Sequence, residues 1–135
     1  MEDKLSLEAQ LQPLLTDLYY PSESDEPVDF VTSPLNLEGP LTDAHLREWL
    51  QLPAEIPIEE RAEDDFWSPV TEEKEWYGED EKARTAQFGQ LKATVNEHLT
   101  DRQYFRVGET EITLYLLGRQ PDGTWAGLKT MVVET

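Results

Sequence analysis

The first apolar pattern of the chain is a run of leucines at helical spacing between Leu5 and Tyr20. Ser6 is placed to cap such a helix at its N-terminus. Pro13 interrupts the pattern, because proline lacks a backbone N–H and clashes with the preceding turn. We expect the helix either to kink at Pro13 or to begin later, with its apolar face in the core in both cases.

The most regular helical pattern runs from Asp80 to about His98. Its apolar side chains recur every three or four residues, which predicts one buried face. The stripe consists of Phe88, Leu91, Val95 and Leu99. The acidic residues at the start stand at the positive end of the helix dipole, where they are favourable.

Shorter elements are predicted between these two helices. Residues Val28 to Thr32 have the composition of a short strand, and Thr42 begins a helix that Pro53 ends. The apolar residues of that helix are Leu46, Trp49 and Leu50. A glutamate-rich connection with room for a brief strand follows, and then a short segment with Phe66 and Trp67 that is expected to stop at Pro69.

The last third of the chain predicts strands. Gln103 to Val107 and Glu111 to Arg119 are joined at Gly108, and residues 121–123 form a turn into a last strand. The middle strand is apolar on both faces, with Ile112, Leu114 and Leu116 on one and Tyr115 and Leu117 on the other. Such a strand must have other elements packed against both of its faces. The predicted fold is α/β, a three-layer α/β/α sandwich with a mainly antiparallel C-terminal meander, in a single domain over residues 1–135.

The apolar last strand runs from Trp125 to the end of the chain at Thr135. A strand that reaches the terminus would fix the hydroxyl and α-carboxylate of Thr135 and the carboxylate of Glu134 within a short reach. Hard divalent cations prefer oxygen ligands of this kind. The simpler interpretation is that the domain ends at its last strand.

The composition limits the classes of function. The 135 residues include no cysteine, which excludes thiol chemistry and fits a reducing cytoplasm. We expect a cytoplasmic protein, because the N-terminus lacks the pattern of a secretory signal and no run reaches transmembrane length. The net charge is −18. Residues 1–81 hold 23 acidic and four basic side chains, and residues 82–135 hold six and seven. This excess argues against nucleic acid as a ligand and suggests either solubility or a basic partner.

Two stretches concentrate the acidic residues. One is the loop between Pro21 and Pro27, which contains Ser22, Glu23, Ser24 and Asp25. It is either a solvated turn or a preorganised anionic prong, for which two prolines lower the entropy lost on binding. The other runs from Glu72 to Glu81 and contains Glu75, Trp76 and Tyr77. Its aromatic residues either tuck under the loop or form an exposed anchor with an acidic rim, as in an interface hot spot.

Catalytic candidates are few, and we expect neither an enzyme nor a cofactor. His45 and His98 lie in predicted helices without a motif around them, and both are interpreted as ordinary side chains. Carboxylate pairs are expected by chance at this acid content. No phosphate loop, zinc spacing or EF-hand appears in the sequence.

Three stretches together resemble the nuclease A inhibitor (NuiA) family. They are residues 22–24 at the start of the acidic loop, residues 75–81, and the ending Val132-Val133-Glu134-Thr135. The resemblance extends to residues 104–108 and 126–128 and to the total length, and it is weaker at Pro13 and between Asn36 and Asp65.

The resemblance implies an α/β/α protein that inhibits a sugar-nonspecific, Mg²⁺-dependent nuclease of the ββα-metal type as a monomer in a 1:1 complex. It implies that Glu23 contacts basic residues of the nuclease, that Trp76 is an anchor, and that Thr135 reaches the catalytic magnesium. Ser22, Ser24, Asp25, Glu75, Tyr77 and Glu134 are their neighbours in the predicted partner surface. The alternatives are a binding protein for another basic partner, or a small acidic metal-binding protein or enzyme.

Overall fold

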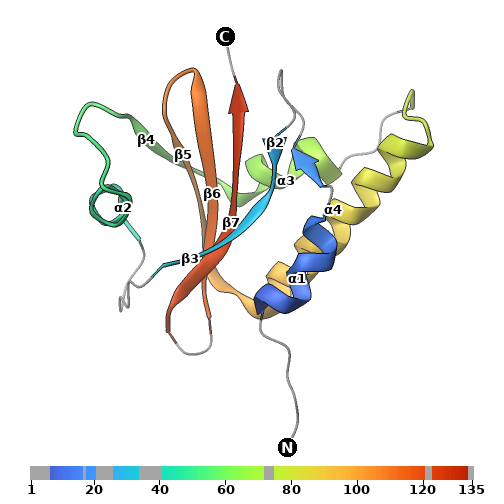
Figure 1. The fold of residues 1–135 in the computed structure, drawn as a ribbon, viewed down its shortest axis with the longest axis horizontal. Helices are drawn as coiled ribbons and strands as arrows, with labels where there is room; N and C mark the ends of the chain where they lie inside the picture. The colour runs from blue at the N-terminus through green and yellow to red at the C-terminus, as the bar shows by residue number, and fades with distance from the viewer. Residues whose placement is uncertain are drawn as a thin grey trace, which may run out of the picture.

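A five-stranded antiparallel sheet forms the centre of the molecule, with helices packed against it (Figure 1). The computed structural model describes residues 7–16, 18–20, 26–33, 41–71, 75–120 and 123–133. The predicted α/β class is confirmed by this arrangement of helices and strands.

The sheet has the strand order β3-β7-β6-β5-β4, and every neighbouring pair is antiparallel. In that order the strands are Asp29–Ser33, Trp125–Val133, Glu111–Arg119, Thr100–Val107 and Ile58–Arg61. The last three strands of the chain therefore form the expected meander. The strand predicted at 28–32 lies at one edge of the sheet, and the brief strand of the glutamate-rich connection lies at the other.

Strand β6 is buried on both faces, as its sequence predicts. Ile112, Leu114 and Leu116 belong to one hydrophobic cluster, and Tyr115 and Leu117 belong to a second cluster across the sheet. Because side chains alternate along a strand, one strand contributes to both clusters. The two clusters together hold the helices against the sheet.

Three helices cover the first face (Figure 1): α1 (Leu7–Leu15), α3 (Glu63–Thr71) and α4 (Glu79–His98). The stripe predicted for the long helix is confirmed, since Phe88, Leu91 and Val95 are fully buried together with Leu99 at its C-cap. No helix in the described ranges is both long enough and apolar enough to cross a membrane.

The second face is covered by α2 (Asp43–Leu50) and the connection that follows it. Thr42 is its N-cap, as predicted, and the helix ends at a left-handed Gln51 (φ 56°), ahead of Pro53. Leu46 is fully buried, while Trp49 and Leu50 pack at the border of the cluster.

The first helix is shorter than its leucine spacing predicts. It continues past Pro13 but ends at Leu15, and the chain is extended again at β1 (Tyr19–Tyr20), which pairs with β2 (Glu26–Pro27) in a second, two-stranded sheet. Leu18 and Tyr20 are buried all the same. Their apolar spacing therefore reflects a shared core rather than one continuous helix.

The prediction that the segment with Phe66 and Trp67 stops at Pro69 is wrong. Helix α3 runs through Pro69 to Thr71, and Val70 is buried in the same cluster as the two aromatic residues. Proline removes the donor for the carbonyl of Asp65, but Asp65 is exposed, so water can hydrate that carbonyl. Burial on both sides of the proline outweighs its cost.

We predict opposite effects for alanine at two glycines. In β7, a Cβ at Gly127 would collide with the carbonyl oxygen of Leu116 in β6, whereas a Cβ at Gly89 on α4 would meet nothing within 4 Å. Gly127→Ala should lower the free energy of unfolding by about 1–3 kcal/mol, because sheet backbone must move. The matched change Gly89→Ala should raise it by about 0.5–1 kcal/mol. Urea unfolding followed by circular dichroism measures both, and equal effects of the two variants would contradict the register of β6 and β7.

Candidate functional site

Trp76 is the most exposed large hydrophobic side chain of the described residues. It is 78% exposed, compared with 44% for Tyr19. Its ring meets the ring of Tyr77 edge to face, with the centroids 6.1 Å apart and the planes at 89°. Tyr77 is partly buried. Of the two arrangements considered for this pair, the structure has Trp76 exposed with Tyr77 beside it.

The backbone next to Trp76 is fixed by the start of α4. Gly78 is the N-cap, its amide donates to Glu81 Oε1 (2.9 Å), and its carbonyl accepts from the amide of Lys82 (3.0 Å). Two turns further along, Gln87 Nε2 donates to the carbonyl of Leu14 (2.6 Å), which ties α4 to α1. Trp76 is therefore presented two residues before the cap of a helix that is anchored in the core.

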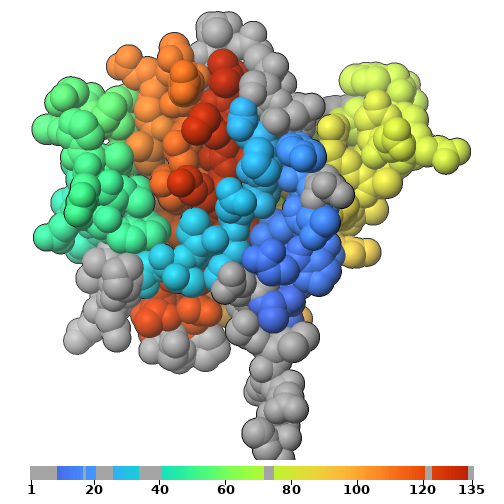
Figure 2. Space-filling model, viewed as in Figure 1, coloured from blue at the N-terminus to red at the C-terminus, as the bar shows by residue number. Residues whose placement is uncertain are grey.

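Acidic residues lie on both sides of this tryptophan in the sequence. Glu75, Glu79, Asp80 and Glu81 are all exposed, and the last three lie in the first turn of α4. Acid at this position is favourable because the helix dipole is positive there. The first turns of α4 project at the side of the molecule (Figure 2). The result is an exposed aromatic ring three residues before an acidic, projecting helix end.

One end of the sheet brings several chain segments together. Val133 of β7 is opposite Glu111 of β6, and Val107 of β5 is opposite Ile58 of β4. The amide of Gly108 donates to the carbonyl of Pro57 (3.0 Å) across this end. We call it the Val133 end of the sheet.

The start of α4 faces the same end of the molecule. Leu99 alone connects α4 to β5, and the two elements run in opposite directions, so α4 begins near the level at which β5 ends. Twenty helical residues span about 30 Å, and the eight residues of β5 span about 26 Å. The start of α4, three residues after Trp76, therefore lies toward the Val133 end of the sheet and to its side (Figure 1).

The predicted residues Ser22, Glu23, Ser24 and Asp25 lie outside the described residues. The chain on both sides of them is fixed. Burial raises the pKa of Tyr20, and its hydroxyl donates to the carbonyl of Phe66 (2.7 Å). The hydroxyl of Thr130 in β7 donates to the carbonyl of Pro27 (2.9 Å). The described neighbours of this loop are thus attached to α3 and to the last strand.

Glu134 and Thr135 also lie outside the described residues. The structure carries β7 as far as Val133, with Val132 buried on the first face of the sheet. The described neighbours of the predicted terminal contact and of the acidic loop therefore lie beside each other. Among the sequence-predicted site residues, only Glu75, Trp76 and Tyr77 fall within the described ranges.

Two hollows flank the turn between β5 and β6, one on each face of the sheet. The larger is about 460 Å³, and the smaller is about 240 Å³. They share the residues that close this end of the sheet, namely Pro57, Gly108 and Glu109. Gly108 has a φ of 118°, which an L side chain rarely adopts, so the turn requires glycine here.

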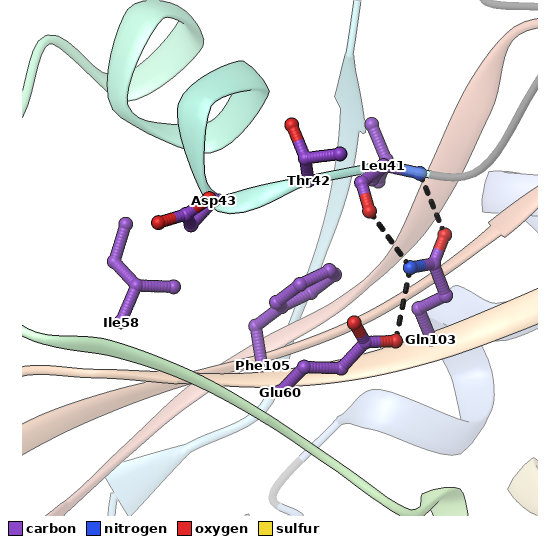
Figure 3. Close-up of a pocket in the computed structure, with 7 residues that line it drawn as sticks. All are labelled: Leu41, Thr42, Asp43, Ile58, Glu60, Gln103 and Phe105. Carbon is purple, nitrogen blue, oxygen red and sulfur yellow. Dashed lines mark hydrogen bonds between the residues drawn. The ribbon is translucent and has the colours of Figure 1, made fainter.

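A further cavity of about 430 Å³ lies between α2 and strands β4 and β5 (Figure 3). Gln103 occupies one side, and its side-chain amide makes three hydrogen bonds. Its Oε1 accepts from the amide of Leu41 (2.8 Å), and its Nε2 donates to the carbonyl of Leu41 (2.9 Å) and to Glu60 Oε2 (3.0 Å). None of the three described site residues predicted from the sequence, Glu75, Trp76 and Tyr77, lines this cavity.

The two histidines have local structural roles that the sequence interpretation missed. The amide of Thr42 donates to His45 Nδ1 (3.1 Å) and the amide of His45 donates back to Thr42 Oγ1 (3.3 Å), which forms a capping box. The only signal of this capping box in the sequence is that His45 follows Thr42 by three residues. A capping box usually has a glutamate or glutamine at that third position. His98 Nδ1 lies 2.9 Å from the carbonyl oxygen of Thr94.

The described residues contain no group of three or more histidine, aspartate or glutamate side chains arranged to hold a metal ion. The described part of the predicted surface presents an exposed aromatic ring, carboxylates close to it in sequence and backbone fixed by the start of α4.

A comparison with curated proteins finds no match for this chain. The model of the family described as nuclease A inhibitor-like protein (NuiA) matches residues 6–135, which is nearly the whole chain. The protein therefore belongs to the nuclease A inhibitor-like family.

Proposed function

We propose that this protein is a non-catalytic inhibitor of a sugar-nonspecific, Mg²⁺-dependent nuclease of the ββα-metal type. Membership of the family suggests an inhibitor with a nuclease as its partner. The observation that carries the proposal is the exposed Trp76 just before the projecting end of α4, with four exposed carboxylates close to it in the sequence. An aromatic ring surrounded by polar groups is the usual form of an interface hot spot.

The proposed mechanism is substrate mimicry. A nuclease cleft holds a polyanion above a divalent cation and is lined with basic side chains. An acidic protein fits such a cleft, and its attraction at low salt raises encounter rates by about 10 to 10³. In the proposed complex Glu23 contacts basic residues of the nuclease and Thr135 supplies an oxygen ligand near its Mg²⁺. The inhibitor offers no phosphodiester, so nothing is cleaved.

The neighbours of these residues complete the proposed surface. Ser22, Ser24 and Asp25 flank Glu23, Glu134 precedes Thr135, and Glu75 and Tyr77 flank Trp76. We propose a single domain with a three-layer α/β/α arrangement as the scaffold. One hydrophobic cluster on each face of the sheet supports this description.

The direct test is digestion of plasmid DNA by a purified ββα-metal nuclease with Mg²⁺, titrated with this protein. A tight 1:1 inhibitor stops digestion sharply near equivalence. Undiminished digestion at a large excess of folded protein contradicts the proposal for that nuclease, and a pull-down with basic proteins then tests the alternative of another partner.

We predict that Trp76→Ala weakens binding by about 2 kcal/mol or more, because the substitution removes a hot-spot aromatic. The free energy of unfolding should change by less than about 0.5 kcal/mol, since the side chain is exposed. Calorimetric titration of the nuclease and urea unfolding measure the two quantities. A change in binding below about 0.5 kcal/mol would remove Trp76 from the interface.

Deletion of Thr135 should leave the fold intact and weaken inhibition, because the proposed oxygen ligand to the nuclease Mg²⁺ is lost. Thr135→Val is the matched variant, since it keeps the α-carboxylate and removes the hydroxyl. Inhibition constants of the two variants separate the hydroxyl from the carboxylate. Unchanged inhibition by the deletion variant would rule out a role in reaching the metal.

Glu23→Gln should lower affinity more at low salt than at high salt, because screening weakens an ionic contact in both proteins as salt rises. Glu48→Gln is a control of equal charge, since Glu48 is exposed on α2, away from the proposed surface. Inhibition constants are measured at two salt concentrations. An equal loss for Glu23→Gln at both would argue against an ionic contact.

A further inference from the structure

The larger hollow at the Val133 end of the sheet is a groove with an apolar wall and an acidic rim. The wall is formed by Ile56 and Pro57, which precede β4. The rim is formed by Glu55 on the same segment and by Glu109 and Glu111 on the turn into β6. The hydrogen bond from Gly108 to Pro57 joins the two sides at the base, so the groove is part of the sheet scaffold.

The charge in this groove is not balanced by its own residues. Glu55, Glu109 and Glu111 are exposed, and among the residues that the structure describes no lysine or arginine lines the groove. The neighbouring hollow differs, because Arg61 lies there and its Nε is 3.1 Å from Glu59 Oε1. The groove therefore offers an apolar strip beside carboxylates, which suits a lysine or arginine whose alkyl stem lies along apolar surface while its charged end stays at the rim.

The position of the groove connects it to the proposed nuclease surface. Glu111 is paired directly with Val133, two residues before Thr135. Neighbouring strands are about 4.8 Å apart, so β4 lies about 14 Å from β7. A standard interface covers about 800 Å² on each partner, equivalent to a disc of about 16 Å radius. A partner centred on the end of β7 would therefore cover the groove.

The cavity of Figure 3 is a weaker candidate for the same chemistry. Asp43 and Glu60 line it, but Glu60 already accepts a hydrogen bond from Gln103. It lies between the N-terminus of α2 and strands β4 and β5, and of its lining residues only Ile58 belongs to the Val133 end of the sheet.

We propose that the groove between residues 55–57 and 108–111 binds a lysine or arginine side chain from the rim of the nuclease cleft. This inference rests on the proposed function and adds a contact on the side of β7 opposite β3. The contact is ionic with an apolar stem, and it extends the inhibitor surface across the width of the sheet.

The test is the triple variant Glu55→Gln, Glu109→Gln, Glu111→Gln, assayed as an inhibitor of the same ββα-metal nuclease. Each exposed ion pair contributes little, so the three together should weaken inhibition about tenfold at low salt and less at high salt. A second triple variant, Glu48→Gln, Asp64→Asn, Glu97→Gln, removes the same charge from exposed positions elsewhere. It should change inhibition by less than about threefold, which is the share expected from net charge alone.

Two outcomes separate the failure of this inference from that of the proposed function. If the unaltered protein inhibits, and Trp76→Ala weakens it, but the two triple variants inhibit equally, the groove contact is wrong and the proposed function stands. If the unaltered protein does not inhibit this nuclease, both the proposed function and this inference are contradicted for that nuclease. Circular dichroism melts of both triple variants confirm that each compared protein is folded.

Discussion

The structure depends on the burial of β6 on both faces. A strand with Leu114 and Leu116 on one side and Tyr115 and Leu117 on the other cannot lie at a solvent surface, so each face needs its own cover. Helices α1, α3 and α4 supply one cover, and α2 with its following connection supplies the other. Neither cover is dispensable, because fully burying one such side chain contributes about 1.5–3 kcal/mol.

This constraint places the charged parts of the chain at the periphery. With a net charge of −18, the protein repels itself, and the acidic side chains are tolerated where water or a partner can surround them. The start of α4 and the Val133 end of the sheet are such places. Both are attached to the core, α4 through Phe88 and the sheet end through Val132. The proposed contacts would therefore be held by a rigid body, which lowers the entropy lost on binding.

Periodicity predicted the elements whose side chains repeat regularly. The bounds of β6 and the buried stripe of α4 follow directly from their apolar spacing, because a single face or pair of faces decides the pattern. Prediction from periodicity failed where tertiary packing outweighed the local sequence preference. Pro69 lies inside α3 because Val70 beyond it is buried. Leu18 and Tyr20 belong to the core but not to the first helix. An apolar residue in the sequence indicates burial, but it does not indicate whether the backbone there is helical or extended.

The candidate site was predictable in part. The sequence placed Trp76 among acidic residues, but spacing alone could not decide whether the ring is buried, and the structure has it exposed. The groove at residues 55–57 and 108–111 could not be predicted. Its two sides are about 50 residues apart in sequence and meet only through the pairing of β4 with β5. The capping box of His45 was missed because histidine is an uncommon third residue in that motif.

Amide hydrogen exchange of the 1:1 mixture with a ββα-metal nuclease tests the central claim most directly, because it locates the covered surface without any substitution. If the proposed contacts form, exchange slows at residues 75–78 and 108–111 and stays unchanged in α2. Slower exchange confined to α2 and the cavity of Figure 3 would contradict these contacts.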